Sequence, residues 1–97
     1  MIEEADFVIA GGGSAGCVLA SRLSENGRFR VVLLEAGRSS DLFWVNMPAG
    51  IAKTFARTDL NWFYATEPDQ TLNGRSVIWW AGRMLGGGSA INGMVYI

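Results

Sequence analysis

Histidine is absent from this 97-residue chain, and cysteine occurs once, at Cys17. A structural zinc site of the usual kind needs four Cys or His ligands, so these residues cannot build one. One cysteine also excludes an internal disulfide framework. Because histidine is the most common general base in enzymes, any reaction in which this chain takes part draws its base from elsewhere than a histidine of residues 1–97.

The chain also lacks an excess of either charge, since eight basic and nine acidic residues leave a net charge of −1. Without a basic stripe, the sequence argues against nucleic acid and membrane surfaces as partners. No apolar run reaches the roughly 20 residues of a membrane-spanning helix. The acidic start MIEEAD lacks the positive charge of a secretory signal. Together with the single cysteine, these features predict a reduced, cytoplasmic setting.

Apolar residues are abundant, at 49% of the chain with four Trp and five Phe. This composition excludes a disordered segment. It also supplies more apolar surface than a domain of this size readily buries. The sequence stops within the apolar run 94–97. We therefore expect residues 1–97 to be the N-terminal part of a larger domain, with the substrate domain absent from them.

A glycine cluster follows the first strand-like run, in the stretch FVIAGGGSAGC at 7–17. Gly11, Gly13 and Gly16 match the G-x-G-x-x-G pattern of dinucleotide-binding proteins. In that pattern the first glycine permits a tight turn, the second admits a pyrophosphate, and the third lets the helix approach the strand. A helix beginning near Ser14 would direct its free N–H groups at the phosphates.

The surrounding sequence gives this motif its weight. Apolar residues recur at helical spacing after Ser14, Asn26-Gly27 is a helix stop, and Val31–Leu34 is a second strand-like run. Residues 6–36 therefore predict a βαβ unit of Rossmann type. Glu35 follows the second strand, where a carboxylate accepts hydrogen bonds from ribose hydroxyls and disfavours the 2′-phosphate of NADP. This glycine pattern, the dinucleotide-binding fingerprint, does not by itself distinguish FAD from NAD. The alternative to dinucleotide binding is a simple glycine-rich connector between packed elements.

Residues 38–80 predict a loop-rich excursion with one short helix, then a hairpin. Its strands are expected at Trp62–Thr66 and Val77–Trp80, and Asn73-Gly74 is a turn signal. Residues 82–97 form a second glycine-rich segment. The predicted fold class is α/β: a Rossmann-like βαβ unit with a hairpin excursion, an incomplete part of a larger FAD/NAD(P)-binding domain.

Four stretches carry a family resemblance that spans the chain: FVIAGGGSAGCVLASRLSE with VVLLEAG, MPAG, NWFYATEP and, most specifically, GRMLGGGSAINGMVYI at 82–97. They resemble the N-terminal FAD-binding segment of the glucose–methanol–choline (GMC) oxidoreductases, which include choline and alcohol dehydrogenases. The resemblance implies FAD as cofactor and a small-molecule alcohol as substrate. It also implies oxidation of CH–OH to an aldehyde or ketone, with hydride passing to flavin N5. The family's catalytic His-His or His-Asn pair would lie beyond Ile97, so residues 1–97 are predicted to be inactive alone.

The same resemblance implies which residues hold the cofactor. The pyrophosphate would be held by Gly11, Gly13, Ser14, Ala15 and Gly16, and the adenosine ribose by Glu35 and Ala36. The linker of the flavin would pass Arg83, Met84, Gly87 and Ser89, with Ser89 capping a short helix. The isoalloxazine would meet Asn92, Gly93, Met94 and Val95.

Three positions depart from the family pattern. Gly88 stands where many members carry Ser or Thr, which removes one hydroxyl contact. Ala81 stands where Arg is common, which removes a positive charge. Ile91 occupies the place where some members carry a His that tethers the flavin, so we expect FAD to be bound non-covalently.

Other features admit two interpretations. We expect Trp62, Tyr64, Trp79 and Trp80 to pack the hairpin onto the flavin-binding unit, with an aromatic substrate channel as the alternative. Cys17 is expected to fill space rather than to act as a redox thiol. For the chain as a whole, the alternatives are another Rossmann-type FAD- or NAD-binding protein, or a truncated remnant without activity.

Overall fold

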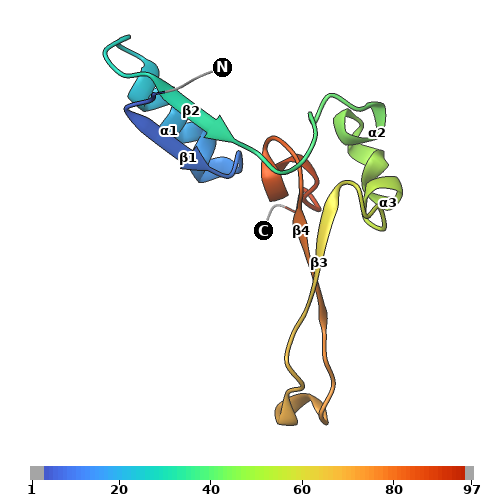
Figure 1. The fold of residues 1–97 in the computed structure, drawn as a ribbon. Helices are drawn as coiled ribbons and strands as arrows, with labels where there is room; N and C mark the ends of the chain where they lie inside the picture. Colours follow the sequence, from blue (N-terminus) through green and yellow to red (C-terminus); the bar gives the residue numbers. More distant parts are fainter. Residues whose placement is uncertain (1–3, 96–97) are drawn as a thin grey trace.

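The computed structural model describes residues 4–95 (Figure 1). The chain forms a parallel βαβ unit, a cluster of short helices and an antiparallel hairpin, in that order. The helices and strands are β1 (Phe7–Ala10), α1 (Ser14–Ser24), β2 (Val31–Leu34), α2 (Phe43–Asn46), α3 (Ile51–Thr54), β3 (Asn61–Ala65) and β4 (Ile78–Gly82), with single 3₁₀ turns at Pro48–Gly50, Gln70–Leu72 and Gly87–Ala90.

The βαβ unit confirms the predicted bounds of both strands. β1 and β2 pair in parallel, with Phe7 opposite Val31 and Ala10 opposite Leu34. Helix α1 crosses from one strand to the other and packs against both. After α1, Gly27 adopts a left-handed φ of 68° and donates its N–H to the Ser24 carbonyl at 3.0 Å, as the helix-stop signal predicted.

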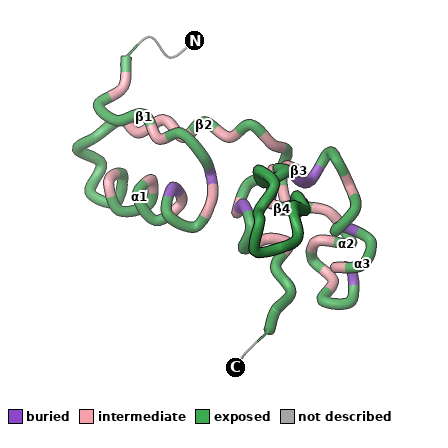
Figure 2. Tube along the Cα trace, turned by 90° about the horizontal axis from the view of Figure 1, so that it is seen from below, coloured by how far each residue is buried: buried purple, intermediate pink, exposed green. Residues whose placement is uncertain are grey.

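The strands differ from expectation in their burial. Apolar runs such as these are typical of buried parallel strands, but Val8 is 63% exposed and Leu34 is 56% exposed. The reason is that α1 covers one face of a sheet with only two strands, whereas parallel sheets are normally covered on both faces. Figure 2 shows how little of the described chain is buried. Its only buried hydrophobic side chains are Leu60 and Met84.

The segment between β2 and the hairpin contains more helix than predicted. Instead of one short helix, α2, the 3₁₀ turn Pro48–Gly50 and α3 follow one another. Pro48 begins the 3₁₀ turn, a position where the missing N–H costs nothing. Gly50 lies against the Trp44 carbonyl so closely that a β-carbon there would clash with it. This contact folds the three short elements into one cluster.

The hairpin is shifted slightly from its predicted position. β3 and β4 begin and end at Asn61–Ala65 and Ile78–Gly82, and Asn61 pairs with Gly82. Ala81 and Gly82 are weak strand formers, so local sequence did not extend β4 to them, but pairing with β3 does. Asn73 and Gly74 form the turn with φ values of 58° and 74°, after the 3₁₀ turn Gln70–Leu72.

The described residues form an elongated body. The Cα radius of gyration is 16.6 Å, whereas a compact 100-residue domain has about 13 Å. The hairpin projects away from the βαβ unit and meets it only at its base (Figure 1). The expected packing of the hairpin aromatics onto this unit is therefore restricted to the base, and Trp79 is 66% exposed.

Among residues 4–95, no helix combines the length and apolar character needed to cross a bilayer.

Candidate cofactor-binding site

The first glycine loop leaves β1 and leads directly into α1. Gly11 has a φ of 98°, a left-handed value that favours glycine. A β-carbon at Gly16 would clash with the Gly11 carbonyl oxygen, so this glycine lets α1 approach the turn. Around Gly13, by contrast, no atom beyond the adjacent residues lies within 4 Å of where a β-carbon would stand. The fingerprint therefore combines two glycines that the fold needs with one that leaves open space.

The N-terminus of α1 borders that space. Its first hydrogen bond within the loop runs from the Cys17 N–H to the Gly13 carbonyl at 2.9 Å. No side chain of the described residues caps the helix, and its first turn contains no acidic residue. The leading N–H groups have no acceptor inside the helix, and they form the positive end of its dipole. This arrangement suits an anionic group such as a pyrophosphate.

Glu35 lies immediately after β2 and binds two backbone segments. Its Oε2 accepts the Gly12 N–H at 2.7 Å, and its Oε1 accepts the Gly37 N–H at 2.7 Å. Each carboxylate oxygen has two lone pairs, so Glu35 keeps capacity for two further hydrogen bonds. It can therefore fix the loop and bind ribose hydroxyls at the same time.

The second glycine segment contacts the first one directly. The Gly86 N–H donates to the Gly12 carbonyl at 2.6 Å, and a β-carbon at Gly87 would lie 3.0 Å from the Gly13 Cα. The Leu85 N–H donates to the Arg38 carbonyl at 3.0 Å. Gly37 crosses the Arg83 main chain so closely that a β-carbon would clash with its carbonyl. Two segments from opposite ends of the chain thus form one site.

An open groove of ≈ 760 Å³ lies beside these contacts. It is lined by both glycine segments, the end of β2 and the base of the hairpin: Ala10, Gly11, Gly13, Leu34, Glu35, Ala36, Trp62, Trp80, Ala81, Gly82, Gly87 and Gly88. A second cavity of ≈ 480 Å³ shares Trp80, Ala81, Gly82 and Gly88 with it and extends to Asn92 and Gly93. The two cavities therefore adjoin across the base of β4.

Most of the expected site residues are near this groove, but not all in the expected way. The structure places Gly11, Gly13, Glu35, Ala36 and Gly87 in the groove lining, and Asn92 and Gly93 in the lining of the adjoining cavity. Ser14 and Ala15 are exposed in the first turn of α1. Ser89 lies inside the 3₁₀ turn Gly87–Ala90 rather than capping it, because its hydroxyl donates back to the Gly86 carbonyl at 2.6 Å.

Four other residues of the expected site lie outside the linings of the groove and the adjoining cavity. Met84 is 0% exposed and belongs to the core beneath the groove, so we propose no cofactor contact for its side chain. The Arg83 guanidinium lies 4.4 Å from the centroid of the Trp62 ring. Met94 and Val95 are exposed, and the Met94 N–H donates to Asn92 Oδ1 at 2.7 Å. Residues 96–97 of the expected flavin segment lie outside the described residues.

Sequence reasoning missed two glycines that build the site. Gly12 is the unconstrained position of the fingerprint, yet a β-carbon there would lie 2.9 Å from Leu85 Cδ1 and 3.2 Å from Glu35 Oε2. Its carbonyl also accepts the Cys17 thiol at 3.2 Å, so Cys17 supports this loop. Gly37 was read only as the end of the EAG stretch. At both positions the sequence shows a glycine, but it does not show which distant residue approaches that glycine.

An exposed ion cluster joins the start of the excursion to the turn before β3. Asp59 accepts hydrogen bonds from Arg57 and from Arg38, the latter at 3.4 Å. The Arg57 hydrogen bond is the main reason that the pKa of Asp59 lies below its usual value, and the pKa of Arg57 is raised in return. The Thr71 hydroxyl and N–H similarly lower the pKa of Asp69 at the hairpin tip. These carboxylates are structural and lie outside the groove lining.

Comparison with known proteins identifies the family. The family model described as GMC oxidoreductase matches residues 5–97. The chain belongs to the GMC oxidoreductase family. Among GMC relatives, it is 52% identical over 92 residues to alcohol dehydrogenase [acceptor] of Pseudomonas putida, covering 95% of this chain and 17% of the relative. It is 46% identical over 102 residues to mitochondrial choline dehydrogenase of Mus musculus, covering 98% of this chain and 17% of the relative. The chain thus spans about one sixth of the length of either relative.

Solved structures agree with this GMC assignment. Pyridoxine 4-oxidase from Mesorbium loti superposes with a TM-score of 0.86 at 40% identity, over 97% of this chain and 18% of that one. A fungal aryl-alcohol oxidase superposes with a TM-score of 0.71 at 27% identity, over 97% of this chain and 16% of that one. The expected Rossmann-like, partial FAD-binding fold is therefore confirmed, and FAD is the cofactor that the family implies.

The groove fits FAD in its chemistry. A dinucleotide needs free N–H groups for its phosphates, a carboxylate for its ribose and glycines where the backbone approaches it. The helix start at Ser14, the two spare acceptor sites of Glu35 and the open space at Gly13 supply these three features. The adjoining cavity extends from the shared lining residues to Asn92 and Gly93.

Proposed function

We propose that this chain is the FAD-binding portion of a flavin-dependent oxidoreductase that acts on the CH–OH group of a small alcohol. The observation that carries the proposal is the direct joining of the two glycine segments, through Gly86 and Gly12, around a groove that Glu35 helps to line. A plain nicotinamide-binding domain has no need of the second segment. The acceptance of a hydride from the alcohol carbon is the chemistry that FAD supplies when it is bound.

The proposed role of the residues is to bind and orient. The first turn of α1, with Gly13, Ser14, Ala15 and Gly16, would hold the pyrophosphate through backbone N–H groups. Glu35, beside Ala36, would accept the ribose hydroxyls. Gly87 and the exposed Ser89 would border the linker, with Arg83 at its flank. Asn92, Gly93, Met94 and Val95 would present main chain to the isoalloxazine. No residue of the chain is proposed as the catalytic base.

Substituting Glu35 tests the ribose contact. In Glu35→Gln, the amide nitrogen must face one of the two N–H donors that the carboxylate now accepts, at Gly12 or Gly37. A hydrogen bond to a charged acceptor contributes about 1.5–3 kcal/mol. We therefore expect FAD affinity to fall about 10-fold or more, measured by titrating apoprotein with FAD and following flavin fluorescence.

The matched control for this experiment is Glu25→Gln. Glu25 lies just after α1 in an exposed ion pair with Arg22, away from the groove lining. This change removes the same charge and should leave FAD affinity within about twofold, because exposed pairs contribute little. Equal affinities for Glu35→Gln and Glu25→Gln would contradict the ribose role of Glu35.

The oxidation itself is tested on the complete protein that carries this segment. Purified protein should show the absorbance of oxidised flavin, and anaerobic addition of a substrate alcohol should bleach it. Simple primary alcohols, benzylic alcohols and choline form the first panel, because the relatives are named for alcohol and choline. Retained flavin absorbance with every alcohol would remove the activity proposal while leaving the binding proposal intact.

We also propose that the FAD is held without a covalent bond. Ile91 has no nucleophilic atom, and the chain has no histidine to tether a flavin. Denaturing the purified holoprotein with acid and removing the precipitate should leave the yellow colour in the supernatant. A yellow pellet that survives washing would overturn this proposal and place a tether outside residues 1–97. The cytoplasmic setting and the small-molecule partner stay predictions.

A further inference from the structure

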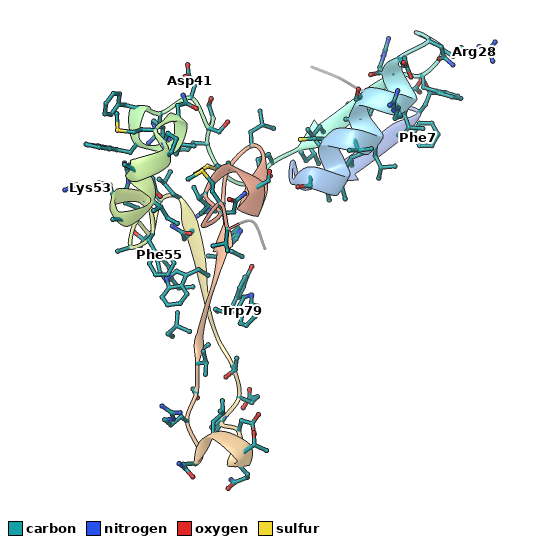
Figure 3. The ribbon with its side chains drawn as sticks, turned by 180° about the vertical axis from the view of Figure 1, so that it is seen from behind. Phe7, Arg28, Asp41, Lys53, Phe55 and Trp79 are labelled. Atoms are coloured by element: carbon teal, nitrogen blue, oxygen red, sulfur yellow. The ribbon has the colours of Figure 1, made fainter. Side chains whose placement is uncertain are left out.

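The second glycine segment lies between two parts of the fold. Figure 3 shows the βαβ unit, which carries Phe7, on one side of the 3₁₀ turn Gly87–Ala90, and the cluster of short helices, which carries Lys53, on the other. Toward the βαβ unit, the segment is held by the hydrogen bond from the Gly86 N–H to the Gly12 carbonyl. Its place beside the groove also depends on how it is held toward the helix cluster.

Main-chain hydrogen bonds hold the start of this segment on two sides. The Leu85 N–H donates to the Arg38 carbonyl at 3.0 Å. The Arg83 N–H donates to the Leu60 carbonyl at 2.7 Å. Met84, between these two donors, pairs with Arg38 as an isolated parallel bridge, and Met84 and Leu60 are both 0% exposed. The start of the segment is therefore fixed between the loop after β2 and the turn before β3.

An ion pair joins these two attachment points. Arg38 Nη1 donates to Asp59 Oδ2 at 3.4 Å, and Asp59 directly precedes Leu60 in the chain. The other partner of Asp59 is Arg57, whose Nε donates to Oδ1 at 2.9 Å within the same turn. Arg57 thus orients the carboxylate that Arg38 meets. Because the side chains of Arg38 and Asp59 are 51% and 45% exposed, salt can screen the attraction between them.

We propose that Arg38 and Asp59 form a latch that positions the second glycine segment, so that breaking the ion pair speeds the release of FAD. Both residues lie outside the groove lining, so they act through the segment rather than on the cofactor. This inference rests on the proposed function, because the segment has to border FAD for its position to matter. Without the latch, the assembled groove is populated less often, and affinity falls in proportion. Exposed ion pairs contribute little, so the expected effect is about threefold.

The test measures how fast FAD leaves the complete holoprotein. Holoprotein is diluted, and the released flavin is separated by ultrafiltration and measured by its absorbance over time. At about 0.01 M salt, Arg38→Gln should release FAD about threefold faster than wild type. At about 1 M salt, where charges are screened beyond about 3 Å, the two proteins should release FAD at the same rate. Arg38→Lys keeps the charge and should recover most of the slow release.

A second variant and a control separate the latch from a general effect of lost charge. Asp59→Asn should also speed FAD release, and the double variant with Arg38→Gln should be no faster than Asp59→Asn alone, because both changes break the same pair. Arg22→Gln is the control, since it breaks an exposed ion pair with Glu25 at the end of α1. It should release FAD at the wild-type rate at both salt concentrations.

Three results would overturn the latch. They are a wild-type rate of release in Arg38→Gln, a faster release that persists at high salt, and additive effects in the double variant. A lower melting temperature of Arg38→Gln with unchanged FAD release would show a merely structural ion pair and would overturn it as well. If the wild-type protein binds no FAD at all, the proposed function itself fails, and that result is distinct from the others.

Discussion

Replacing Gly13 by alanine is expected to lower FAD affinity about 100-fold while leaving the apoprotein as stable as wild type. Gly13 has a φ of −78°, which any residue adopts, and no atom beyond the adjacent residues lies within 4 Å of the position of the added methyl group. The methyl group therefore costs the fold nothing. It occupies the space in front of α1, where the pyrophosphate would receive charge-assisted hydrogen bonds from N–H groups.

A 100-fold loss corresponds to about 3 kcal/mol of binding free energy. FAD titration of the apoprotein measures the affinity, and thermal melting of the same apoprotein measures the fold. Ser21→Ala, on the exposed side of the same helix, is the control and should change neither quantity. Normal FAD affinity in Gly13→Ala would show that the pyrophosphate lies elsewhere.

Replacing Gly16 by valine should have the opposite profile, in which the stability of the apoprotein falls. The added β-carbon would clash with the Gly11 carbonyl, which is main chain and cannot rotate away. Overpacking of this kind typically costs 1–3 kcal/mol and sometimes more. Because α1 and β1 must separate to relieve the clash, we expect a loss of about 3 kcal/mol in the stability of the FAD-binding domain.

The measurement is the melting temperature and soluble yield of Gly16→Val apoprotein beside those of Gly13→Ala. Gly16→Ala adds the same β-carbon without the γ-methyl groups and should show a smaller loss in the same direction. If Gly16→Val melts like wild type, the close approach of α1 to the Gly11 turn is not required by the fold. The two glycines are three residues apart in the sequence, so the contrast between their variants separates what the fold requires from what FAD binding requires.

The βαβ unit was predicted well because the apolar runs and glycines that define it act on residues next to them in the sequence. The apolar runs at Phe7–Ala10 and Val31–Leu34 became β1 and β2 with the predicted bounds. Gly11, Gly16 and Gly27 act through the turns and helix ends in which they stand. The family resemblance then supplied FAD, which the spacing of glycines does not distinguish from NAD.

The remaining features depend on contacts between distant segments. The role of Gly12 arises from Leu85 and Glu35, and that of Gly37 from the main chain of Arg83. β4 extends to Gly82 because Asn61 lies opposite it. Met84 has the flanking sequence of a cofactor loop but is buried, because the bridge to Arg38 draws this segment inward. None of these partners can be read from a window of neighbouring residues.

The bond between Gly86 and Gly12 has a consequence for how the protein is made. Segments far apart in sequence meet late, because closing a long loop costs entropy before any contact repays it. A nascent chain therefore displays the first glycine loop well before the second segment arrives to complete the groove. During that interval the exposed apolar surface of β1 and β2 is unprotected. Supplying flavin during synthesis should accordingly raise the yield of native protein, since a ligand that binds only the assembled groove draws folding forward.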